Sequence, residues 1–142
     1  MIRNVVAAAA LAALASMNVA WAGPTPAPKD AHAYIGYPND GQVVPANKPV
    51  RVWFGLRYMG VAPKSVKYAN TGHHHLLIDT DLPPMDQEIP SDRQHLHFGA
   101  GETETMITLP PGKHTLQLLM GDENHIPHNP PVYSKKITVI AK

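Results

Sequence analysis

Cysteine is absent from this chain of 142 residues. Disulfide bonds therefore contribute nothing to the fold, and any metal site has to be built without thiolate ligands. Charged residues are also scarce, at 16% of the chain, with 12 Lys+Arg against 11 Asp+Glu. Nucleic acids and anionic membrane surfaces are bound by basic faces, so this near-neutral composition argues against both as partners.

Long hydrophobic runs are absent too, except near the beginning of the chain. There, Arg3 is followed by an apolar run, Val5–Ala20, and by the small-x-small pattern Ala20-Trp21-Ala22. This arrangement is typical of a secretory signal peptide, and the run is too short for a stable membrane span. We therefore expect residues 1–22 to be a signal peptide cleaved after Ala22. The mature protein is then expected to be periplasmic or secreted and not membrane-spanning.

Helical periodicity is the third feature that the chain lacks. No segment keeps an apolar period of 3.6 residues, and 15 prolines disfavour helices further. Apolar and polar residues alternate instead, as they do in strands. The clearest run places five side chains on one face: Val50, Val52, Phe54, Leu56 and Tyr58.

Short alternating runs separated by Pro, Gly, Asn and Asp predict an all-β fold. Seven strands are expected, at residues 34–36, 50–58, 72–79, 94–98, 104–109, 113–120 and 133–140. Seven strands suffice for an immunoglobulin-like antiparallel β-sandwich, which is the predicted fold class. The turn Pro110-Pro111-Gly112 predicts a hairpin between two of these runs.

The domain organisation follows from length and composition. Residues 23–31 contain three prolines and are expected to form a leader that does not pack. Residues 32–142 are expected to form a single β-sandwich domain, because this length supports one core but not two.

Histidine is abundant where cysteine is absent. Nine histidines occur, and six of them form three close pairs, namely His73/His75, His95/His97 and His125/His128. Neutral imidazole is a common metal ligand, and an imidazole-rich site without thiolates suits Cu(II) or Zn(II). All six residues are therefore candidate metal ligands.

Strand alternation assigns these side chains to faces. In the run 72–79, His73 and His75 share one face, while His74 shares the other face with apolar residues and is expected to pack in the core. In the run 94–98 the same argument turns both histidines outward. If the two strands are neighbours, four imidazoles lie on one surface within reach of a single ion.

The third pair lies in a polar loop, residues 121–131, which follows an apolar strand. Such loops carry function more often than stability, and this one is able to complete a site or build a second one. The alternative is structural: Asp122 and Asn124 would cap a turn, and His125 and His128 would be solvated.

The remaining histidines have structural explanations. His114 follows the Pro-Pro-Gly turn, where a corner residue that bonds back to the backbone is expected. His32 lies next to the leader and receives no role.

Three classes of function remain open. The chain has no nucleophile elbow, P-loop, dinucleotide-binding glycine motif or zinc-binding His-Glu-x-x-His helix. The leading hypothesis is a periplasmic or secreted protein that binds Cu(II) or Zn(II) for storage, delivery or sensing. The second is a metal-free module that binds an envelope protein or ligand, with histidines as a pH-responsive surface. The third is a small metalloenzyme.

Four motifs in the second half of the chain carry a resemblance to a known family. They are GHHHLLID at residues 72–79, QHLHFG at 94–99, LPPGKHTL at 109–116 and GDENHIPH at 121–128. Over most of residues 50–140 the chain resembles the small secreted bacterial domains of domain-of-unknown-function family 4399. The departures are small, with Ala100 in place of an expected glycine and Glu102 in place of an expected glutamine. The resemblance implies a secreted bacterial domain with these histidine motifs and implies no established activity.

Overall fold

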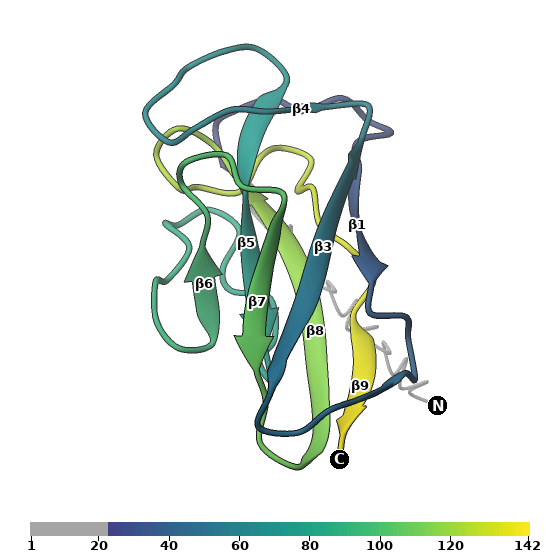
Figure 1. Cartoon of the computed structure of the whole chain (residues 1–142). Helices are drawn as coiled ribbons and strands as arrows, with labels where there is room; N and C mark the ends of the chain where they lie inside the picture. The colour runs from purple at the N-terminus through teal and green to yellow at the C-terminus, as the bar shows by residue number, and fades with distance from the viewer. Residues whose placement is uncertain (1–22) are drawn as a thin grey trace, which may run out of the picture.

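The computed structural model describes residues 23–142, so the expected signal peptide at residues 1–22 lies outside the described residues. Within this range the chain is built from strands and contains no helix, and hence none that would be long and apolar enough to cross a membrane (Figure 1). In chain order the strands are β1 (His32–Tyr37), β2 (Val43–Val44), β3 (Pro49–Arg57), β4 (Gly60–Val61), β5 (Thr71–Ile78), β6 (His95–His97), β7 (Glu104–Thr108), β8 (Gly112–Gly121) and β9 (Ile137–Ala141).

The strands form two sheets that pack as a sandwich (Figure 1). The smaller sheet has the order β1-β3-β7, and the larger has the order β2-β9-β8-β5-β4, with β6 also paired to β5. This arrangement confirms the predicted all-β sandwich. The two strands that the sequence did not predict, β2 and β4, have two residues each and pair in parallel with β9 and β5.

The main core lies between the two sheets. It is formed by the alternating apolar residues of both sheets, with Val52 and Phe54 of β3 facing Leu118 and Met120 of β8. The apolar face predicted for this strand extends one residue too far, however. Tyr58 lies beyond the end of β3, has a left-handed φ of 61° and is 68% exposed, so it does not share the face of Val52 and Phe54.

The turn at residues 110–112 does not form the predicted hairpin. β7 pairs with β3 in the smaller sheet, whereas β8 pairs with β5 and β9 in the larger one, so the turn carries the chain from one sheet to the other. The predicted alternation of both strands is confirmed. Their apolar faces, however, face each other across the core and are not neighbours in one sheet. His114 has its expected corner role, because its Nε2 lies 2.8 Å from the Pro110 carbonyl oxygen. Its Nδ1 also lies 2.6 Å from Asp79 Oδ2.

A second, smaller apolar layer covers the outer face of the larger sheet. Leu77 of β5 and Leu119 of β8 contact Ile89, which belongs to the long connection between β5 and β6. Leu82 and Met85 of the same connection pack against this layer. The outer face at β5 is therefore buried, although the sequence predicts a solvent-exposed surface there.

The proline-rich segment 23–31 packs against the domain, so the expectation that it would not pack is wrong. Pro26 forms a parallel bridge with Asn129. The backbone N–H of Ala27 donates to the Asn129 carbonyl at 3.0 Å, and Asn129 N–H donates to the Thr25 carbonyl at 2.8 Å. Proline tolerates this edge position because a single extended strand needs only alternate N–H groups for pairing.

Candidate metal centre

β5 supplies the first two histidines of the site. Its side chains alternate between the main core and the smaller layer, to which Leu77 belongs. On the main-core side, His74 packs against Phe54 with 5.2 Å between ring centroids. His73 and His75 lie on the other side of the strand, as the alternation predicts.

β6 brings His97 to the same place. β5 and β6 pair antiparallel, with His75 opposite His97 and Leu77 opposite His95. The two His-x-His strands are thus neighbours, which is the condition that the sequence argument required. Gly99 provides room for the imidazole, because a Cβ at this position would lie 2.4 Å from His97 Cε1.

A tight loop after β8 supplies His125. The buried Asp122 carboxylate accepts hydrogen bonds from the backbone N–H groups of Asn124 and Ile126, both at 2.9 Å. His125 has a left-handed φ of 63°, and its N–H donates to the Asp122 carbonyl at 2.9 Å. The turn-capping role expected of Asp122 is therefore real. The same turn directs His125 toward the other imidazoles and not into solvent.

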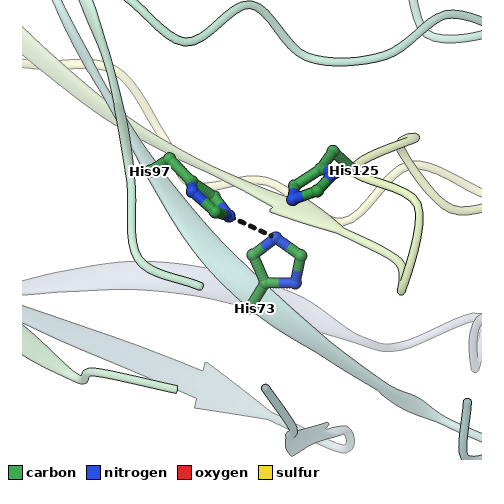
Figure 2. A group of neighbouring side chains, drawn as sticks. All are labelled: His73, His97 and His125. Carbon is green, nitrogen blue, oxygen red and sulfur yellow. Dashed lines mark hydrogen bonds between the residues drawn. The ribbon is translucent and has the colours of Figure 1, made fainter. Parts of the chain in front are cut away.

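Three imidazoles from three separate segments converge in this region. Figure 2 shows His73, His97 and His125 with ring nitrogens directed toward one another. The ring centroids lie 5.0 Å apart for His73 and His97, 5.1 Å for His73 and His125, and 4.6 Å for His97 and His125. One nitrogen from each ring falls within 4.8 Å of the other two.

The spacing of these nitrogens is close to that of ligands on one ion. His73 Nε2 and His97 Nε2 lie 3.2 Å apart, as in a hydrogen bond in which one ring donates and the other accepts. Two nitrogens bonded to zinc at 2.0–2.1 Å are separated by about 3.3 Å at a tetrahedral angle. The pair therefore has the spacing of two ligands on one ion, and a His125 nitrogen lies within 4.8 Å of both.

Burial favours the neutral form of His73, His75 and His97. The side chains of His73 and His75 are 0% and 1% exposed. Burial, followed by the neighbouring imidazoles, lowers the pKa of His73 to about 4 and that of His75 to about 2. Burial and the proximity of His125 also lower the pKa of His97. Neutral imidazole is the form that coordinates metal.

His75 lies beside the three converging rings. Its ring centroid is 4.9 Å from His73, 5.1 Å from His97 and 6.2 Å from His125. Gly121 makes room for this ring, because a Cβ there would lie 2.8 Å from His75 Cε1. The Nδ1 atom of His75 is buried and has no hydrogen-bond partner among the described residues. His75 therefore adds a fourth imidazole, with one unpartnered ring nitrogen, beside the three converging rings.

The structure does not bring His95 and His128 into this group. The antiparallel register sets His95 opposite Leu77, two residues away from His75, where its Nδ1 lies 2.9 Å from the Asp92 carboxylate. His128 is neither solvated nor in the group: it is fully buried, and its Nε2 lies 3.0 Å from the Thr71 carbonyl oxygen.

Charged residues surround the imidazoles at the edge of the site. Glu88 Oε1 lies 3.8 Å from His125 Nδ1. The positive charge of Lys64 lowers the pKa of His97, after burial and His125, while Glu102 acts in the opposite direction. The buried carboxylate of Asp122 favours positive charge at His73. The immediate surroundings thus contain more negative than positive charge, which suits a bound cation.

Sequence reasoning missed two glycines that shape the site without coordinating anything. Gly99 and Gly121 create the space for the imidazoles of His97 and His75. The available signal was their position, since each glycine stands within two residues of a histidine motif in the sequence or directly opposite one across the sheet.

Comparison with known proteins identifies the family but no function. No curated protein and no solved structure matches the chain. The family model described as a domain of unknown function, DUF4399, matches residues 52–142, which include every strand that contributes to the histidine site. Because this match covers more than half of the chain, the protein belongs to the DUF4399 family.

Proposed function

We propose that this protein binds one Cu(II) or Zn(II) ion through His73, His97 and His125, with His75 as a further ligand. The convergence of three imidazoles, with nitrogens within 4.8 Å of one another, is the observation that carries the proposal. The three residues come from β5, β6 and the loop after β8, so local sequence preference does not account for their meeting.

The ligand chemistry supports these two metals. Imidazole nitrogens without thiolates favour Cu(II) and Zn(II), whereas Ca(II) and Mg(II) require several oxygen ligands. The lowered pKa values of His73 and His97 favour the neutral form that binds metal, which reduces proton competition. The nearby carboxylate of Asp122 balances part of the ion's charge.

The cellular role proposed is metal storage, delivery or sensing outside the cytoplasm. The signal-like sequence of residues 1–22 supports a periplasmic or secreted location. The full burial of His73, His75 and His128 argues against the alternative of a pH-responsive binding surface, because a surface for a protein partner has to be exposed.

A small metalloenzyme is the second candidate. If His75 does not coordinate the ion, the other three imidazoles leave a coordination position open, as in catalytic zinc sites. Turnover of peroxide or superoxide by the copper-loaded protein would support this candidate, and its absence with both substrates would exclude that redox activity.

A histidine-to-asparagine variant tests the metal site with little change of backbone. Asparagine tolerates the left-handed φ of residue 125, so His125→Asn removes the ligand and keeps the turn. After dialysis against a chelator, calorimetric titration with Zn(II) at pH 7.5 should give one equivalent for the wild type. The variant should bind at least about 100-fold more weakly, a loss of roughly 2.7 kcal/mol.

His95→Asn is the matched control. It makes the same chemical change at a partly buried histidine on β6 that lies outside the group. Its zinc affinity should equal that of the wild type. A wild-type protein that binds neither Zn(II) nor Cu(II), or equal affinities for all three proteins, would exclude the proposed site.

A further inference from the structure

The segment that precedes β1 contacts the loop that carries His125. Residues 25–27 run beside residue 129, with hydrogen bonds from Ala27 N–H to the Asn129 carbonyl and from Asn129 N–H to the Thr25 carbonyl. These contacts join two parts of the chain that are about 100 residues apart in the sequence. They place the Thr25 side chain over the loop.

Thr25 makes one specific side-chain contact there. Its hydroxyl donates to Asp122 Oδ2 at 2.6 Å. The other carboxylate oxygen, Oδ1, accepts the backbone N–H groups of Asn124 and Ile126. Asp122 is 1% exposed, so these three donors satisfy the charge of a buried carboxylate.

Asp122 in turn fixes the backbone on both sides of His125. Its N–H donates to the Ile126 carbonyl, and its carbonyl accepts the N–H of His125, both at 2.9 Å. The carbonyl of His125 accepts the N–H of Ile89 at 2.8 Å. A connected series of hydrogen bonds therefore holds the left-handed φ of His125, and Thr25 is the outermost residue of this series.

We infer that Thr25 is a positioning residue for the metal ligand His125, and that residues 23–27 form part of the metal-binding unit. The inference rests on the proposed function. Thr25 does not touch the imidazoles and acts through Asp122. Without its hydroxyl, Asp122 Oδ2 loses its donor and the loop has freedom to leave the conformation that presents His125.

The size of the expected effect follows from the behaviour of residues that orient metal ligands. Loss of such a partner typically weakens metal binding by about 10- to 100-fold. We expect Thr25→Val, which keeps the shape and removes the hydroxyl, to weaken zinc binding by about tenfold. Thr25→Ser keeps the hydroxyl and should remain within about twofold of the wild type.

A double-mutant cycle separates positioning from general stabilisation. Zinc affinity is measured by calorimetry at pH 7.5 for the wild type, Thr25→Val, His125→Asn and the double variant. If Thr25 acts through His125, Thr25→Val should weaken binding in the wild-type background and change nothing once residue 125 is asparagine. Thr108→Val, the same change on the exposed edge of β7, is the control and should have no effect.

Each other outcome has a distinct meaning. Equal weakening by Thr25→Val in both backgrounds, or no weakening in either, would overturn the inference while leaving the metal site intact. Failure of the wild type to bind zinc would refute the proposed function, and the inference with it. If Thr25→Val does not fold, Thr25→Ala takes its place in the same cycle.

Discussion

The two sides of β5 place histidine in different surroundings. On one side, His74 packs against Phe54 of the opposite sheet. On the other side, the ring centroids of His73 and His75 lie 4.9 Å apart, and the rings of His97 and His125 lie next to them. All three β5 histidines are at most 1% exposed. Consecutive residues of the same type are thus equally buried in two different surroundings.

The two sides differ in what surrounds the ring and not in how deeply it is buried. The pKa of His73 and that of His74 are both lowered to about 4, mainly by burial. At His73 the neighbouring imidazoles contribute to this lowering, whereas at His74 the backbone of Glu102 and Gly55 partly opposes it. Neither ring nitrogen of His74 has a hydrogen-bond partner of normal geometry among the described residues. A low histidine pKa is therefore no sign of a metal site unless other ligands face the same ring.

Acid should destabilise the metal-free protein from both sides of β5, and this is the largest expected effect. A histidine with a depressed folded-state pKa must gain a proton on unfolding, so its stabilisation is complete above pH 6.5 and is lost as pH falls toward the folded value. For a folded pKa of about 4, the loss reaches about 3 kcal/mol for each of His73 and His74. Urea denaturation of chelator-treated protein at pH 7.5, 5.5 and 4.5 measures it.

His74→Leu isolates the contribution of the core side. Between pH 7.5 and pH 4, the free energy of unfolding of the variant should fall by about 3 kcal/mol less than that of the wild type, because leucine has no proton to gain. At pH 7.5 its stability should equal or exceed that of the wild type, since an unpartnered buried polar group is removed. Identical pH profiles for the two proteins would show that His74 is not desolvated as the structure indicates.

Substitutions on the two sides of β5 should differ in their effect on zinc affinity, although acid destabilises both sides to a similar extent. His73→Leu removes the imidazole that lies within 5.1 Å of three others, measured between ring centroids, and should weaken zinc binding by at least about 100-fold, or roughly 2.7 kcal/mol. His74→Leu makes the same change one residue away and should leave zinc affinity within about threefold. Calorimetric titration at pH 7.5 compares them. The reverse pattern would place the site on the main-core side of β5.

The sequence predicts the sides of β5 correctly because strand alternation depends only on local geometry. That β5 and β6 are neighbours is only a condition in the sequence argument, and the structure meets it. The sequence does not predict their register, and a two-residue offset determines that His97 meets His73 while His95 meets Asp92. Register depends on the length and packing of the connecting segment, which no periodic pattern reveals.

The remaining errors concern contacts between distant parts of the chain. The connection that contains Ile89 covers the outer face of the larger sheet and turns an expected surface into a buried layer. The segment around Thr25 contains three prolines within a few residues, which predicts poor packing, yet it docks through Asp122 and Asn129. Neither contact has a local sequence signal, because each depends on where another loop lies.

His114 provides the smallest test of the comparison, since it is a buried histidine whose pKa moves in the opposite direction. Burial lowers the pKa of this group, but hydrogen bonds to Asp79 and to the Pro110 carbonyl outweigh it and leave the pKa above its usual value.

A raised folded-state pKa contributes stability below pH 6.5 that is lost as pH rises through the folded value. His114→Gln should therefore destabilise the protein more at pH 5.5 than at pH 8.5. The difference should stay below about 1 kcal/mol, because the Asp79 side chain is 42% exposed and screened by solvent. Urea denaturation of both proteins at the two pH values measures this difference. A larger loss of stability at pH 8.5 would mean that His114 is neutral in the folded protein, as His73 and His74 are, in spite of its contact with Asp79.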